Sequence, residues 1–214
     1  HAQVERMTSR CAYYNEIEPF AVQWLRNLIA AGHLPDGVVD ERSIADVDAK
    51  DLEGFSECHF FAGIGVWPLV LRRANFPGDR MVWSGSCPCQ PFSSAGKGAG
   101  VDDERHLWPV WSALIRKCCP DVVVGEQVSS PGGRAWWDLV AADLEDMGYA
   151  AGALDTCAAG VGAPHIRLRL YWVGHADVEP AQRRRESRDV SGEAREACQE
   201  TREQRVWGAS DNGG

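Results

Sequence analysis

Residues 58–65 of this chain read CHFFAGIG, a short β-prone run that ends in a turn with two glycines. An amphipathic stretch follows from Trp67 to Ala74, with Leu69, Val70 and Leu71 at its centre. Glycines let a backbone approach a bound molecule closely, and the N-terminus of a helix offers free N–H groups. The pattern predicts a nucleotide-like ligand at the turn, although the same pattern also occurs in turns that are purely structural.

Further strands and helices alternate on both sides of this unit. We predict strands at residues 13–17, 38–39, 81–83, 121–125, 152–157 and 168–173, and helices at 20–31, 67–74, 107–118 and 135–147. Such alternation is typical of a parallel sheet with helices on both faces. We therefore expect an α/β fold with a Rossmann-like, doubly wound, mostly parallel sheet, whose ligand lies beyond the carboxyl ends of the strands.

Composition indicates a globular chain. Hydrophobic residues make up 44% and charged residues 25% of the 214 residues, which excludes a disordered chain. No apolar run approaches the roughly 20 residues of a membrane span, and no basic-then-apolar signal opens the chain, so we expect a cytoplasmic protein. Residues 1–6 resemble a tag remnant. We expect N-terminal βα units over 7–57, a core over 58–178 and an Arg/Glu-rich tail or linker over 179–214.

Charge and cysteine content limit the classes of function. The net charge is −9, with −6 in residues 1–57 and −2 in residues 58–178. Nucleic-acid-binding domains are usually basic, so this balance argues mildly against DNA without excluding a local groove. The eight cysteines include no C-x-x-C pair, so we expect no structural zinc site.

Two residues stand where catalytic groups are found in such folds. Cys89, in the segment PCQPFS (88–93), follows a predicted strand, and a thiolate there is a strong nucleophile. The alternative is a buried pair with Cys87. Glu126 directly follows the predicted strand 121–125, where a partly desolvated carboxyl group can donate a proton.

The segment HIRLR (165–169) alternates polar and apolar residues. On a strand, His165, Arg167 and Arg169 would point to one face of the sheet. Two cations on an inner face require an anionic or carbonyl partner. The alternative is a pair of surface arginines on an edge strand.

Together these segments resemble the motifs of the cytosine-5 DNA methyltransferase family, of the phage and bacterial type. The cofactor motif corresponds to 58–65, the nucleophile motif to 88–93, the Glu-Asn-Val motif to 125–128 and the Gln-x-Arg-x-Arg motif to 165–169. The gaps of 37 residues from Cys89 to Glu126 and 41 from there to Arg167 are of the family's size. The resemblance implies a methyltransferase fold that uses S-adenosylmethionine and a cytosine in DNA.

The resemblance also implies catalytic roles. Cys89 would add to C6 of cytosine while Glu126 protonates or hydrogen-bonds N3, so that C5 can accept a methyl group. Arg167 and Arg169 would hold the ring at O2 and the nearby phosphate or sulfur environment. Because the target base must reach the cysteine, base flipping is implied.

The order of the cofactor motifs departs from the family's. Only 24 residues separate Gly65 from Cys89, too few for the two βα units that the family inserts there. Upstream, NEIEPFA (15–21) resembles the second motif and RSIADV (42–47) the third, with Ser43 in place of an aspartate. A parallel sheet permits this order, because it constrains neighbours in space more than chain order. The alternative is an unrelated N-terminal extension.

The resemblance assigns a set of cofactor-binding residues, among which Glu16 would bind the ribose hydroxyls. The set is Glu16, Ile17, Ser43, Ile44, Phe61, Ala62, Gly63, Ile64, Gly65 and Pro88.

Other departures leave alternatives open. Gln127 replaces the asparagine of the Glu-Asn-Val motif, and its extra length is expected to shift the loop that aims Glu126. The family's target-recognition domain is not evident, so a partner chain or a missing segment would supply recognition. The alternatives are an S-adenosylmethionine-binding pseudoenzyme or subunit of a split enzyme, and a methyltransferase for single-stranded or free cytosine nucleotides. Retention of Cys89, Glu126 and both arginines argues against a degenerate site.

Overall fold

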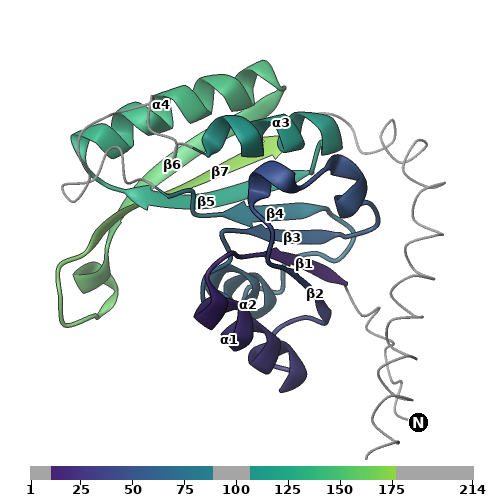
Figure 1. The fold of residues 1–214 in the computed structure, drawn as a ribbon. Helices are drawn as coiled ribbons and strands as arrows, with labels where there is room; N and C mark the ends of the chain where they lie inside the picture. The colour runs from purple at the N-terminus through teal and green to yellow at the C-terminus, as the bar shows by residue number, and fades with distance from the viewer. Residues whose placement is uncertain (1–10, 89–106, 177–214) are drawn as a thin grey trace, which may run out of the picture.

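The structure is a computed structural model that describes residues 11–88 and 107–176 (Figure 1). Its strands are β1 (Ala12–Asn15), β2 (Gly37–Asp40), β3 (Glu57–Phe60), β4 (Val82–Gly85), β5 (Val122–Val128), β6 (Tyr149–Cys157) and β7 (Leu168–Ala176). Its α-helices are α1 (Pro19–Ala30), α2 (Val66–Arg73), α3 (Trp108–Cys118) and α4 (Pro131–Asp146). Short 3-10 helices are η1 (Ile44–Asp46), η2 (Ala49–Leu52) and η5 (Ala158–Val161).

The seven strands form one sheet in the order β2-β1-β3-β4-β5-β7-β6. The first five of these pair in parallel, whereas β7 runs antiparallel to β5 and to β6. Figure 1 shows α3 and α4 on one face of the sheet and α1 and α2 on the other. The expected α/β, Rossmann-like, mostly parallel fold is confirmed. Strands β1 and β2 lie beside β3, on the side away from β4.

Helix α1 illustrates how local sequence sets an element. The Glu18 side chain accepts a hydrogen bond from the backbone N–H of Ala21 (2.7 Å), and Pro19 occupies the first turn, where its missing N–H costs nothing. Four apolar side chains at helical spacing are buried: Ala21, Val22, Leu25 and Ile29. The helix therefore packs one apolar face against the sheet.

Tryptophan side chains dominate the core between the sheet and α3 and α4. The rings in mutual contact are Trp108, Trp111, Trp136, Trp137 and Trp172, and Trp83 joins them through Phe60. Two rings lie directly on strand glycines. A Cβ on Gly85 would lie 2.6 Å from the Trp111 ring, and one on Gly125 would lie 2.3 Å from the Trp172 ring. Glycine is therefore required at both positions, at the end of β4 and in the middle of β5.

Several elements have other bounds than the sequence-based predictions, among them β5, α4 and β7. Strand β5 continues to Val128, because antiparallel pairing with β7 extends past the predicted end, and Glu126 lies within it opposite Tyr171. Helix α4 begins at Pro131, where Ser130 caps it. Strand β7 begins at Leu168, as predicted, and continues past the predicted end to Ala176. The prediction that His165, Arg167 and Arg169 share one strand face is therefore wrong, because the first two belong to the β6–β7 connection.

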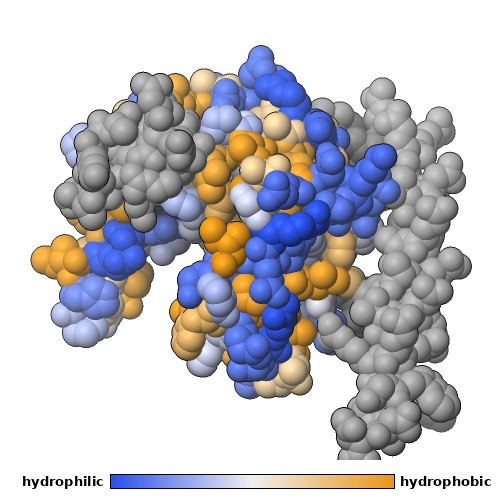
Figure 2. All heavy atoms as spheres, viewed as in Figure 1, coloured by the Kyte–Doolittle hydropathy of each residue, from blue (hydrophilic) through white to orange (hydrophobic). Residues whose placement is uncertain are grey.

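This connection projects beyond the body of the sheet (Figure 1). Its side chains Val161 and Ile166 are 76% and 84% exposed. Apolar side chains are visible on the projecting arm in Figure 2. Across residues 11–88 and 107–176, no helix has the length and apolarity needed to cross a membrane, and no three His, Cys, Asp or Glu side chains are grouped to hold a metal ion.

Candidate active site

Glu16 lies against the glycine turn, although the two are far apart in the sequence. The backbone N–H of Gly63 donates to Glu16 Oε2 (2.7 Å), and that of Glu18 donates to Oε1 (2.9 Å). The N–H of Ala62 donates to the carbonyl of Asn15 (3.1 Å). The cause is the pairing of β1 with β3, which aligns Asn15 with Phe60 and brings the two carboxyl ends to one edge. Two predicted cofactor segments therefore form one surface.

The glycine turn has a backbone that favours glycine. Gly65 has φ +81° and caps the start of α2, and a Cβ there would lie 2.7 Å from Leu34. Gly63 has φ +53° with open space around it. Phe61, also left-handed, packs edge-on to Trp111 with 6.0 Å between the ring centroids. Ala62 and Ile64 complete the turn, with Ile64 exposed. All five predicted residues of this segment therefore lie together.

The predicted residues at the ends of β1 and β2 differ in exposure. Ile17, next to Glu16, is exposed. Ser43 is exposed too, and its Oγ accepts from the N–H of Ala45 (3.3 Å) at the start of η1. Ile44 is only 2% exposed and belongs to the core. Ser43 and Ile17 therefore present side chains to solvent, whereas Ile44 does not.

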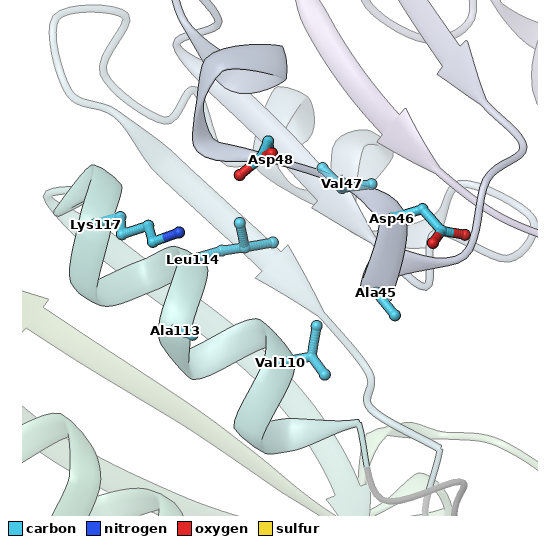
Figure 3. A pocket seen from close by; sticks show the side chains of 8 residues that line it. All are labelled: Ala45, Asp46, Val47, Asp48, Val110, Ala113, Leu114 and Lys117. Atoms are coloured by element: carbon cyan, nitrogen blue, oxygen red, sulfur yellow. The ribbon is translucent and has the colours of Figure 1, made fainter.

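A hollow of about 340 Å³ begins one residue after Ile44 (Figure 3). One wall is the segment 45–48, and the other is α3. Figure 3 shows Val110 and Leu114 of α3 pointing towards this segment. The remaining lining residues are Ala45, Asp46, Val47, Asp48, Ala113 and Lys117. The hollow thus lies between α3 and the segment that follows Ile44, and none of the residues predicted to bind the cofactor lines it.

The end of β4 leads towards the predicted nucleophile. Cys87 is buried in the core on the α3 side, at 4% exposure, and Pro88 is exposed. Cys89, the predicted nucleophile, lies outside the described residues. The structure therefore bears on the Cys87 alternative only: this thiol is shielded from solvent.

Trp67 connects three parts of the site and was not identified from the sequence. Its indole N–H donates to Ser86 Oγ (3.2 Å), just before Cys87 and Pro88. Its ring lies edge-on to Tyr171 of β7, with centroids 6.2 Å apart. An aromatic residue in the first turn after the glycines is the sequence signal that could have identified it.

Glu126 and Arg169 form an ion pair between Oε1 and Nε across β5 and β7. Their side chains are 25% and 20% exposed, so the pair is partly desolvated yet reachable from solvent. Register places Glu126 opposite Tyr171 and Arg169 opposite Val128. Arg169 therefore has the anionic partner that an inner arginine requires. Arg167 is exposed in the β6–β7 connection, where its carbonyl accepts from Ala158.

Gln127 and Glu126 both lie within the continuous strand β5. The β5–β7 register runs without a break through Glu126, Gln127 and Val128. Because side chains alternate along a strand, Gln127 points to the opposite face, where it is buried. Its Oε1 accepts from the N–H of Val128 (2.8 Å), while its amide nitrogen finds no hydrogen-bond partner within the described part of the chain.

Comparison with known proteins gives consistent matches. A sequence model of the C-5 cytosine-specific DNA methylase family matches residues 2–206. The Type II methyltransferase M.AgeI of Thalassovita gelatinovora is 30% identical over 155 residues, covering 69% of this chain and 32% of that protein. M.NaeI of Lentzea aerocolonigenes, also a Type II methyltransferase, is 35% identical over 111 residues, covering 50% and 26%. The chain thus spans about a third or less of these relatives.

Among solved structures, a mutant of DNMT2 from Spodoptera frugiperda superposes with a TM-score of 0.51 at 17% identity. The match covers 78% of this chain and 43% of that one. At this identity the likeness concerns the fold alone.

Proposed function

The chain belongs to the C-5 cytosine-specific DNA methylase family, and from this we propose that it transfers the methyl group of S-adenosylmethionine to C5 of a cytosine in DNA. The observation that carries the proposal is the Glu126–Arg169 pair, near the end of β5 and the start of β7. It joins two residues that the family resemblance assigns independently to the same cytosine ring.

The residues around the glycine turn fit S-adenosylmethionine. Each Glu16 carboxylate oxygen accepts one backbone N–H and retains a further lone pair, with which it can accept a ribose hydroxyl. Exposed Ser43 and Ile17 and the hollow along α3 suit the adenine side. When bound, the cofactor supplies an electrophilic methyl group.

In the proposed reaction the chain acts on the cytosine ring. The Cys89 thiolate adds to C6, and Glu126 holds a proton at N3, so that C5 becomes a carbon nucleophile. After methyl transfer, loss of the C5 proton and expulsion of Cys89 restore the ring. Arg169 orients the Glu126 carboxylate through their ion pair, and in this proposal it also holds the ring at O2. DNA with a flipped-out base is the proposed substrate.

Covalent trapping tests this function. The full chain is mixed with S-adenosylmethionine and duplex DNA of mixed sequence in which 5-fluorocytosine replaces cytosine. Because fluorine cannot leave C5 as hydrogen does, we expect an adduct that survives denaturing electrophoresis. Parallel reactions with single-stranded DNA and with the free 5-fluorocytosine nucleotide distinguish the other substrates. S-adenosylmethionine binding without an adduct on any of the three would contradict the catalytic proposal.

Replacing Glu16 should weaken the binding of S-adenosylmethionine. Charge-assisted hydrogen bonds contribute about 1.5–3 kcal/mol each, so Glu16→Ala is expected to raise the S-adenosylmethionine Kd at least about tenfold by calorimetry. Glu16→Gln keeps an oxygen that can accept from the turn, so its Kd should lie between those of the wild type and Glu16→Ala. Glu53→Ala, at an exposed carboxylate after η2, is the matched control. Equal affinities for Glu16→Ala and the wild type would remove Glu16 from the cofactor site.

A further inference from the structure

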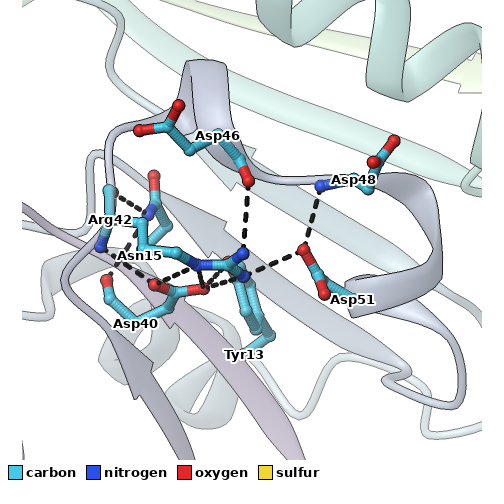
Figure 4. Close-up of polar contacts among 7 residues, drawn as sticks. All are labelled: Tyr13, Asn15, Asp40, Arg42, Asp46, Asp48 and Asp51. Carbon is cyan, nitrogen blue, oxygen red and sulfur yellow. Dashed lines mark hydrogen bonds and ion pairs between the residues drawn. The ribbon is translucent and has the colours of Figure 1, made fainter.

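Arg42 binds both ends of the segment that follows β2 (Figure 4). Its Nε and Nη2 donate to the two carboxylate oxygens of Asp40 at 2.6–3.1 Å. Nη2 also donates to Asp51 Oδ2 (2.9 Å), and Nη1 donates to the carbonyl of Asp46 (3.2 Å). One guanidinium therefore closes residues 40–51 into a loop.

The same loop is joined to the end of β1. Asn15 Nδ2 donates to the carbonyl of Arg42 (2.8 Å), and Tyr13 donates its hydroxyl hydrogen to Asp40 Oδ2 (2.8 Å). Asn15 directly precedes Glu16 in the sequence. The network therefore couples the position of Glu16 to that of the loop.

The loop encloses two of the residues that the resemblance assigns to the cofactor. Ser43 and Ile44 lie inside the loop, and residues 45–48 form one wall of the hollow against α3. Asp51 Oδ2 also accepts from the N–H of Asp48 (3.0 Å), so the far end of this wall depends on the carboxylate that Arg42 binds.

Charge reinforces the geometry. Burial by itself would raise the pKa of Asp40, but hydrogen bonds from Arg42 and Tyr13 outweigh it and hold that pKa below its ordinary value. The N–H of Asp48, followed by Arg42, lowers the pKa of Asp51. Both carboxylates are thus ionised at neutral pH, and the planar guanidinium engages Asp40 bidentately. Such a shared arrangement differs from a single exposed ion pair, which contributes little.

We propose that Arg42 is a positioning residue for the cofactor, which holds the segment Ser43–Asp48 in the shape that the adenosine part of S-adenosylmethionine requires. Arg42 acts through Asp40, Asp51 and the Asp46 carbonyl and does not itself contact the cofactor. The inference rests on the proposed function and gives a role to Arg42, which begins the third motif segment (42–47) but to which the resemblance assigned none.

Calorimetry with the full chain tests the role. If Arg42→Gln leaves the competent shape populated about a tenth of the time, the Kd of S-adenosylmethionine rises about tenfold. The binding of S-adenosylhomocysteine should weaken by the same factor, because this molecule shares the adenosine part. Arg42→Lys, which keeps the charge without the fork, and Asp51→Asn, which removes one partner, should give smaller increases. Arg26→Gln is the matched control: Arg26 is an exposed arginine paired with Glu41, and its variant should stay within twofold of the wild type.

Steady-state kinetics separates positioning from loss of fold. We expect Arg42→Gln to raise KM for S-adenosylmethionine while kcat at saturating cofactor stays near the wild-type value. An affinity unchanged in Arg42→Gln, or a loss of kcat at unchanged KM, would overturn this inference alone. If Arg42→Gln does not fold, unchanged affinity in both Arg42→Lys and Asp51→Asn has the same meaning. A wild-type chain that binds no S-adenosylmethionine would overturn the proposed function and this inference with it.

Discussion

Methyl transfer should fall below detection in Cys89→Ser, while S-adenosylmethionine binding survives. The reason is that a serine hydroxyl is almost fully protonated at neutral pH, whereas a thiol supplies a strongly nucleophilic thiolate. Without addition at C6, C5 of cytosine stays a poor nucleophile. Transfer of a labelled methyl group to DNA measures the reaction, and calorimetry measures the cofactor affinity.

Cys87→Ala is the control for this experiment. Cys87 is buried in the core on the α3 side, so its thiol is shielded from a base in solvent. Alanine is the better replacement here, because a serine hydroxyl in this apolar place would cost about 1–3 kcal/mol. We expect Cys87→Ala to transfer methyl groups. Full activity in Cys89→Ser, or a loss confined to the Cys87 variant, would show that the nucleophile is misassigned.

Glu126→Gln should lower kcat by about 10²–10⁴-fold, the contribution typical of a positioned general acid or base. Glutamine keeps the length of the side chain but cannot hand over a proton to N3, and it loses the ion pair with Arg169. Single-turnover methylation at saturating DNA and cofactor measures the chemical step directly. Glu145→Gln, at an exposed position of α4, should behave as the wild type.

Replacing Arg169 and replacing Arg167 should have different effects on kcat in the same assay. Arg169→Met removes the partner of Glu126, whereas Arg167→Met alters an exposed side chain in the β6–β7 connection. We expect the larger loss of kcat from Arg169→Met. If Arg167→Met proved more damaging, the ion pair would not be the arrangement that matters for catalysis.

Much of the fold follows from local sequence. The strand–turn–helix around CHFFAGIG, the capped start of α1 and the apolar spacing of α3 each lie within about a dozen consecutive residues. Their periodicity therefore predicts the elements without knowledge of the partners. Where an element depends on a distant neighbour, the prediction failed: β5 extends to Val128 only because β7 pairs with it.

The motifs likewise identified candidate residues one segment at a time. Glu16, Gly63, Glu126 and Arg169 were each assigned from the sequence, but no local pattern specifies that Glu16 accepts from Gly63 or that Arg169 binds Glu126. Those contacts arise from strand pairing, β1 against β3 and β5 against β7.

The roles of Arg42 and Trp67 are visible in the tertiary structure but not in the sequence. In the sequence, one is a charged residue after a short strand and the other an aromatic residue at the start of a helix. Their partners Asp51, Ser86 and Tyr171 become neighbours only when the sheet assembles. Types and positions of elements follow from interactions between residues close in the chain, whereas the site depends on distances between residues far apart in it, and these are set by how the strands pair and the helices pack.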